Sequence, residues 1–110
     1  MASFKQNRAA EDMKREIYDI MRSLKDPRIT GLLSIVKLDL SADYSLARVY
    51  ISSIEGMEQT KSAVAGLNSA AGYVRREINH RMKLRRSPEI KFIADDSIAQ
   101  SAEISRILRG

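Results

Sequence analysis

Residues 64–82 read VAGLNSAAGYVRREINHRM, and this stretch sets the fold. Apolar residues recur at helical spacing on either side of three small residues, Ala70, Ala71 and Gly72. Because glycine adopts positive φ and permits close backbone approach, we expect Gly72 to redirect the chain between two helices. The alternative is one long helix that tolerates Gly72 at a cost of about 1 kcal/mol relative to alanine. We prefer the kink, since both apolar stripes can then face the same sheet.

Two strands are expected before this stretch. Residues 32–40 alternate in character, and those expected to share one face are Leu32, Val36, Leu38 and Leu40. Residues 46–51 alternate in the same way, and those expected to share a face are Ala47, Val49 and Ile51. The polar segment 41–45 joins the two runs, which indicates an antiparallel hairpin.

Apolar stripes and capping signals predict the remaining elements. A first helix is expected over about residues 4–25, and Pro27 ends it. A third strand is expected over residues 90–95, and a final short helix over residues 97–108. The order α-β-β-α-α-β-α indicates an α+β protein, with one three-stranded sheet and helices packed on one face. Since no repeat or linker is present, residues 1–110 are expected to form one domain.

The composition excludes several classes of function. The 110 residues include no cysteine and a single histidine, His80, which rules out thiolate catalysis, Cys-based zinc sites and multi-histidine metal centres. No metal or other cofactor is therefore expected. The longest uncharged stretch, residues 62–74, is far short of the roughly 20 apolar residues that span a bilayer. Because the N-terminus also has no apolar signal core, we expect a cytoplasmic protein without membrane contact.

Positive charge is concentrated in the second half of the chain. Residues 1–56 carry a net charge of +1 and residues 57–110 a net charge of +4. On a helix after the kink, cationic and polar side chains lie opposite the apolar stripe, flank it, or continue into the next loop. The predicted RNA-binding residues are Arg75, Arg76, Asn79, His80, Arg81, Lys83, Arg85 and Arg86.

A charge run is more often a solvated face kept for solubility. Here the run is nearly single-signed, whereas the first helix mixes its signs, and this contrast favours phosphate binding. A helix N-terminus at the kink would add free N–H groups beside Arg75 and Arg76. Two other functions stay open. One is an RNA-processing nuclease that uses Asp95, Asp96 or His80, and the other is a protein-interaction module with an acidic partner.

Three blocks of sequence resemble the ribosome-binding factor A family. They are residues 24–29 (LKDPRI); 38–43 (LDLSAD) with 47–52 (ARVYIS); and 70–77 (AAGYVRRE) with 84–92 (LRRSPEIKF) and 96–98 (DSI). The resemblance covers nearly the whole chain and implies a type II KH-like fold. Ordinary KH domains clamp nucleic acid with a Gly-x-x-Gly loop. This family has Ala-x-Gly at a helix-kink-helix instead, which Ala70-Ala71-Gly72 matches.

The same resemblance implies a non-enzymatic assembly factor. It implies binding to the free or immature small ribosomal subunit and its rRNA, through the basic face that follows the kink. It further implies support for maturation of the 5′ region of the small-subunit rRNA, and importance during growth in the cold. An assembly GTPase is an implied further partner, and the protein is expected to be a monomer.

Overall fold

The computed structural model describes residues 4–29 and 32–95. Its elements are α1 (Phe4–Ser23), β1 (Leu33–Leu40), β2 (Leu46–Ser53), α2 (Met57–Ser69), α3 (Ala71–Met82) and β3 (Glu89–Ala94). The predicted α+β class is confirmed, as is the element order through the third strand. The helix predicted over residues 97–108 lies outside the described residues.

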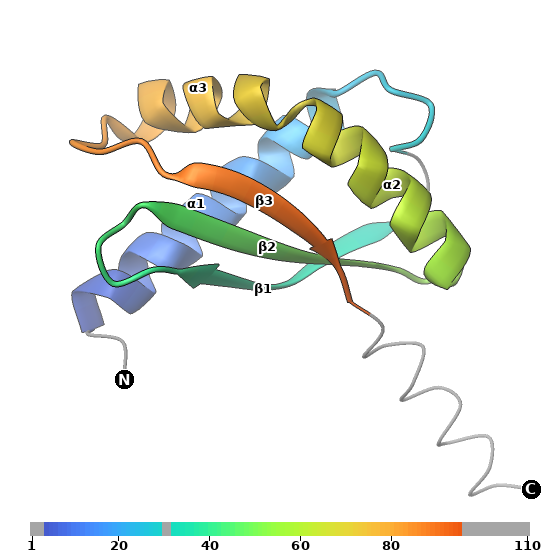
Figure 1. The fold of residues 1–110 in the computed structure, drawn as a ribbon, viewed down its shortest axis with the longest axis horizontal. Coiled ribbons are helices and arrows are strands. Elements are labelled where there is room, and N and C mark those ends of the chain that lie inside the picture. Colours follow the sequence, from blue (N-terminus) through green and yellow to red (C-terminus); the bar gives the residue numbers. More distant parts are fainter. Residues whose placement is uncertain (1–3, 30–31, 96–110) are drawn as a thin grey trace, which may run out of the picture.

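The strands form one mixed sheet in the order β1-β2-β3 (Figure 1). β1 and β2 pair antiparallel, as predicted for the hairpin, and β3 pairs parallel to β2. A parallel pair needs a long crossover, and α2 and α3 supply it. In Figure 1, α1 passes behind the sheet, so the face toward the viewer is the one turned away from α1.

The core lies between the sheet and the helices. Its buried residues come from α1 (Met13, Ile17, Ile20, Met21), from β2 and β3 (Ala47, Val49, Ile51, Ile90, Phe92), and from α2 and α3 (Leu67, Val74, Ile78). These residues belong to the predicted apolar stripes and alternations. Each large side chain among them stabilises the fold by about 1.5–3 kcal/mol on burial, so the core fixes how every helix faces solvent.

The first strand departs from the predicted alternation. Leu32 precedes β1 and its side chain is 68% exposed, so the prediction that it shares a face with Leu38 and Leu40 is wrong. The register with β2 shifts between Ile35 and Lys37, where Val36 is the extra residue of a bulge. A bulge reverses the phase of the side chains that follow it. Leu33 and Ile35 therefore pack against the core, together with the apolar residues after the bulge.

The two helices of the crossover meet at Ala70, which confirms the predicted kink but not its predicted cause. Ala70 has φ −95° and ψ 5°, and it caps both the end of α2 and the start of α3. Gly72 lies within the first turn of α3 and does not have a positive φ. A Cβ atom added there would meet nothing within 4 Å. The proposed use of Gly72 as the pivot is therefore wrong.

Candidate nucleic-acid interface

α3 presents a polar face because its apolar stripe is buried. Val74 and Ile78 are fully buried in the core. The opposite side exposes Arg76, Asn79 and His80. The helix ends at Lys83, which adopts the left-handed conformation and donates its N–H to the Asn79 carbonyl at 2.9 Å. The structure thus brings this part of the predicted site together on one exposed surface.

Three exposed cations on α3 and in the residues after it have no carboxylate partner among the described residues. Arg76, Lys83 and Arg85 are exposed, and within residues 4–29 and 32–95 none of them has a carboxylate oxygen within 4.0 Å. We call Arg76, Asn79, His80, Lys83 and Arg85 the α3 surface. Free cations on a fixed helix can neutralise phosphates and release their counterions, which gives affinity with little sequence selectivity.

Arg75 and Arg86 brace the loop that follows α3. Arg75 donates from Nε to the Ser87 hydroxyl at 3.2 Å and from Nη2 to the Ser87 carbonyl at 2.9 Å. Arg86 donates from Nη1 to the Asp43 carbonyl in the β1–β2 turn at 3.4 Å. Both acceptors are uncharged, so both arginines keep a net positive charge at the rim of the α3 surface.

Arg81 has a different environment from the other predicted site residues. Its Nη1 atom donates to Asp19 at 2.8 Å and to Glu16 at 3.1 Å, and both carboxylates belong to α1. The pKa of Arg81 is raised mainly by its hydrogen bond to Asp19 and next by its hydrogen bond to Glu16. Its charge is balanced within the protein. The structure therefore makes Arg81 a tie between α1 and α3 and separates it from the free cations of the α3 surface.

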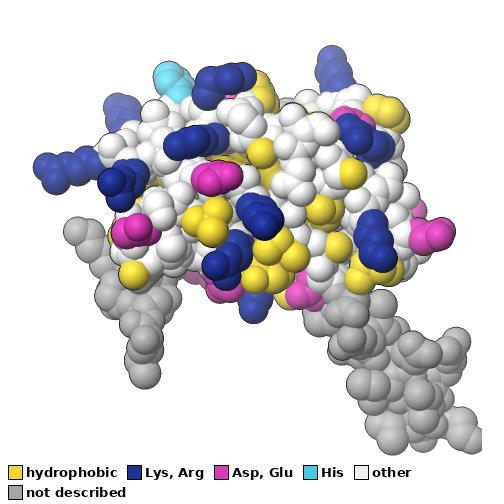
Figure 2. Space-filling view, viewed as in Figure 1, with side chains coloured by type: hydrophobic (Ala, Val, Ile, Leu, Met, Phe, Trp, Pro, Cys, Tyr) yellow, Lys and Arg dark blue, Asp and Glu magenta, His cyan; other side chains and the backbone are white. Residues whose placement is uncertain are grey.

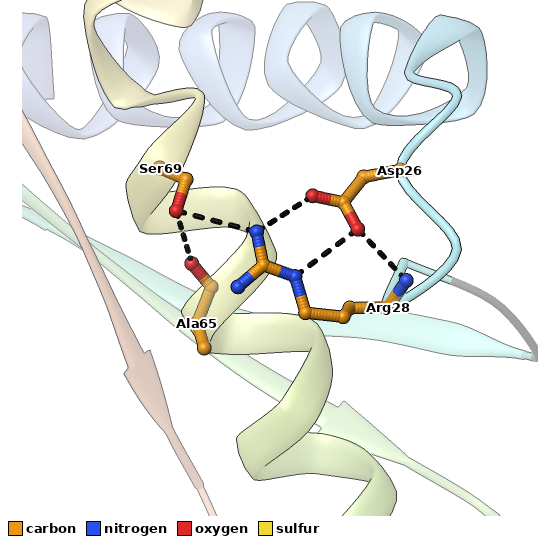
Figure 3. Close-up of polar contacts among 4 residues, drawn as sticks. All are labelled: Asp26, Arg28, Ala65 and Ser69. Atoms are coloured by element: carbon orange, nitrogen blue, oxygen red, sulfur yellow. Dashed lines mark hydrogen bonds and ion pairs between the residues drawn. The ribbon is translucent and has the colours of Figure 1, made fainter.

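The turn that follows α1 is joined to the last turn of α2 by hydrogen bonds, and this contact was not predicted from the sequence (Figure 3). We call this contact, made by Asp26, Arg28 and Ser69, the clasp. The Arg28 guanidinium pairs with the Asp26 carboxylate at 2.8 and 3.1 Å, and the backbone N–H of Arg28 donates to Asp26 at 2.8 Å. Arg28 also donates to the Ser69 hydroxyl at 3.3 Å, which itself donates to the Ala65 carbonyl at 3.1 Å. The hydrogen bonds from Arg28 lower the pKa of Asp26. The clasp ends one residue before the kink.

Gly66 lies directly beneath this clasp and in close contact with its residues. A Cβ atom at Gly66 would lie 3.0 Å from Cγ1 of Ile29 and 3.3 Å from both Cβ of Arg28 and Cγ of Asp26. The backbone of α2 therefore approaches the turn so closely that a side chain at this position would require its neighbours to shift by a few tenths of an ångström. The LKDPRI block contains the turn that makes this contact. Its partner on α2 lies some forty residues later in the sequence, and no local motif marks it.

The chain matches a family model described as Ribosome-binding factor A over residues 5–108. The chain belongs to the ribosome-binding factor A family. A ribosome-binding factor A from Acetivibrio thermocellus is 43% identical over 102 residues, which cover 92% of this chain and 83% of that protein.

Two structures from Thermus thermophilus share the fold. The crystal structure of ribosome-binding factor A from this organism has a TM-score of 0.70 at 26% identity, and the match covers 80% of this chain and 93% of that one. A homology model of the Thermus thermophilus factor, fitted into the cryo-EM map of a 30S–RbfA complex, has a TM-score of 0.66 at 26% identity, and the match covers 80% and 92%. The resemblance drawn from the sequence is confirmed.

The alternative function of an RNA-processing nuclease depends on Asp95, Asp96 or His80. Asp95 follows β3 and its backbone N–H donates to the Ile51 carbonyl at 2.8 Å, while Asp96 lies outside the described residues. Over the described part of the chain, no group of three His, Cys, Asp or Glu side chains could hold a metal ion. Among the helices described, none is long and apolar enough to cross a membrane.

Proposed function

We propose that this protein is a non-enzymatic assembly factor that binds the free or immature small ribosomal subunit, with the α3 surface placed on rRNA phosphates. One observation carries the proposal. Arg76, Lys83 and Arg85 are exposed on one helix-loop unit and lack carboxylate partners within the described ranges. The match to the factor fitted into a 30S complex supports the choice of the small subunit as partner.

The unit that carries these cations is held rigidly. Val74 and Ile78 anchor α3 in the core, Arg81 ties it to α1, and Arg75 and Arg86 fix the following loop. Side chains on an immobilised backbone lose less freedom on binding than those on a loose loop. Asn79 and His80 lie between the cations and supply hydrogen bonds to ribose or base edges. Arg75 and Arg86 contact phosphates at the rim, and Arg81 neutralises the carboxylates of Glu16 and Asp19 beside the α3 surface.

The finer function follows from binding structured RNA. By holding one arrangement of the immature rRNA, the factor assists maturation of the 5′ region of the small-subunit rRNA. Non-native RNA pairings persist longer at low temperature, so this assistance matters most during growth in the cold. The KH-like domain acts as a cytoplasmic monomer, and an assembly GTPase that rearranges the same subunit provides a means of release.

The test compares two charge-reversal variants of equal net charge. Arg76→Glu/Lys83→Glu alters the α3 surface, and Lys25→Glu/Lys61→Glu alters exposed cations elsewhere. Co-sedimentation with purified small subunits is measured over a series of salt concentrations. We expect the α3 variant to bind at least tenfold more weakly, with a salt slope lower by about 2, since each phosphate contact contributes about 0.9. The control variant should keep the wild-type slope.

The proposed site is wrong if both variants bind alike. Thermal melting of each protein shows whether the fold is retained. Because all four positions are exposed, we expect the melting temperatures to stay within a few degrees of wild type.

A further inference from the structure

The face of the sheet turned away from the helices carries side chains that the α3 surface does not use. Strand register places them in two rows across the sheet: Asp39, Arg48 and Lys91 in one, and Lys37, Tyr50 and Ile93 in the other. Figure 2 looks onto this face, and it shows Lys and Arg side chains over the strands among hydrophobic ones. We call these six residues the open sheet face.

Positive charge on this face is only partly balanced. Arg48 and Lys91 are exposed, and neither has a carboxylate within 4.0 Å over the ranges the structure describes. Lys37 lies 3.8 Å from Asp39, and Glu89 stands at the edge of the same face. An ion pair between two exposed side chains contributes little. Lys37 can therefore leave Asp39 and contact a phosphate instead. Lys37, Arg48 and Lys91 are then all available to a polyanion.

An aromatic ring lies at the centre of the same face. Tyr50 is half-buried, its register partner on β3 is the half-buried Ile93, and the Lys37 ammonium is 4.6 Å from the centroid of its ring. Beside Arg48 the surface is hollowed by about 260 Å³, lined also by Asp39, Leu40, Ser41 and Leu46. A phosphate-binding surface needs only the cations. An aromatic ring with an apolar neighbour, lying among the cations, is the additional feature on which unpaired bases stack.

We propose that the open sheet face is a second RNA-binding surface, which takes a short single-stranded segment. Phosphates contact Arg48, Lys91 and Lys37, and a base stacks on Tyr50 after displacing the Lys37 ammonium. Adjacent strands lie about 4.8 Å apart, so a backbone crossing the sheet meets one cation on each strand. This role goes beyond the proposed function, because the α3 surface binds structured rRNA whereas the open sheet face requires unpaired bases.

The experiment measures fluorescence anisotropy of a labelled oligouridylate of about eight nucleotides, within the length range of known single-strand sites. Each variant is made in the full chain. We expect Arg48→Gln/Lys91→Gln to weaken binding about tenfold and to lower the salt slope by about 1.4, two contacts at about 0.7 each. Tyr50→Leu should weaken binding about tenfold without changing the slope, whereas Tyr50→Phe should bind like wild type. Arg76→Glu/Lys83→Glu should retain most of the oligouridylate affinity.

Several results would overturn this inference. They are a wild-type protein that does not bind the oligouridylate, equal binding by the Arg48/Lys91 variant, and equal binding by Tyr50→Leu. A poly-glutamate peptide that binds with the same dependence on Arg48 and Lys91, and with no dependence on Tyr50, would reassign the face to an acidic protein. Failure here leaves the co-sedimentation difference between the α3 variant and its control intact, so the two proposals fail separately.

Discussion

α1 and α3 bury their apolar stripes in the same core, yet the polar face of α1 mixes both signs of charge whereas that of α3 is mainly positive. In the middle of α1, Lys14 pairs with Glu11 at 3.7 Å and Arg15 with Asp12 at 2.6 Å, each one turn away. On α3, Arg76 has no carboxylate within 4.0 Å among the described residues. A cation that already has a carboxylate partner must give up that partner before it contacts a phosphate. The availability of charge, rather than its number, therefore distinguishes the two helices.

Arg81 shows how packing decides which cations remain available. It belongs to α3, but it lies on the side of the helix that faces α1, and the carboxylates of Asp19 and Glu16 contact it there. The carboxylates of the neighbouring helix thus neutralise one cation of the basic run.

The largest expected effect tests whether the buried sides of the two helices contribute equally to stability. Ile17 on α1 and Ile78 on α3 are both fully buried. Changing either to alanine removes buried apolar surface and leaves a cavity, so each variant should lose about 2–5 kcal/mol of unfolding free energy. Urea denaturation followed by circular dichroism measures the loss. A cost confined to one helix would show that the two do not share the core equally.

A smaller effect is expected from breaking the tie between the helices. Arg81→Met keeps an unbranched apolar stem but leaves the carboxylates of Glu16 and Asp19 unpaired near the α3 surface. These charges should repel rRNA, and we expect a roughly two- to threefold loss of affinity for small subunits, comparable to a weak ion pair.

The rescue variant separates charge from structure. Adding Glu16→Gln and Asp19→Asn to Arg81→Met removes the exposed carboxylates without restoring the tie. Affinity that returns to wild type in co-sedimentation supports the electrostatic account. Affinity that stays low would mean that Arg81 acts by holding α3 in place.

The smallest effect concerns the turn that receives Arg86. Hydrogen bonds from the Ser45 hydroxyl and then the Ser41 hydroxyl lower the pKa of Asp43 from its ordinary 3.8 to about 2. Because the pKa of Asp43 is lower in the folded state than in the unfolded state, the ionised side chain stabilises the fold at pH values above the unfolded-state pKa. This contribution is lost as the pH falls from about 4 to about 2. The unfolding free energy of Asp43→Asn should therefore change less than that of the wild type between about pH 4 and pH 2. Asp39→Asn is the control, and urea midpoints at several pH values give the comparison.

Local periodicity was sufficient to predict much of the fold. Val74 and Ile78 on α3, and Val49 and Ile51 on β2, are buried as their spacing indicated, because a helix or strand carries its own repeat. The phase of β1 could not be predicted in this way. The bulge at Val36 is a property of strand pairing, and the sequence of one strand does not show how many residues its partner will oppose.

The candidate site was predictable to a similar extent. The exposed side of α3 followed from the helical wheel, but the ion pairs of Arg81 join residues more than sixty positions apart. Gly72 was expected to redirect the chain because glycine adopts positive φ and permits close backbone approach. The close approach instead occurs at Gly66, where the 26–29 turn meets α2. Contacts between distant segments account for the departures at β1, at Arg81 and at the 26–29 turn.

The parallel pairing of β2 with β3 has a consequence for the order of folding. Leu46 pairs with Glu89, so the strands join only after more than forty intervening residues, including α2 and α3, have been placed. Closing so long a loop is entropically costly and tends to come late. A nascent chain that ends before residue 89 can form the hairpin, but it lacks the strand on which α3 rests. Competence to bind RNA is therefore expected to arise in the last cooperative step of folding.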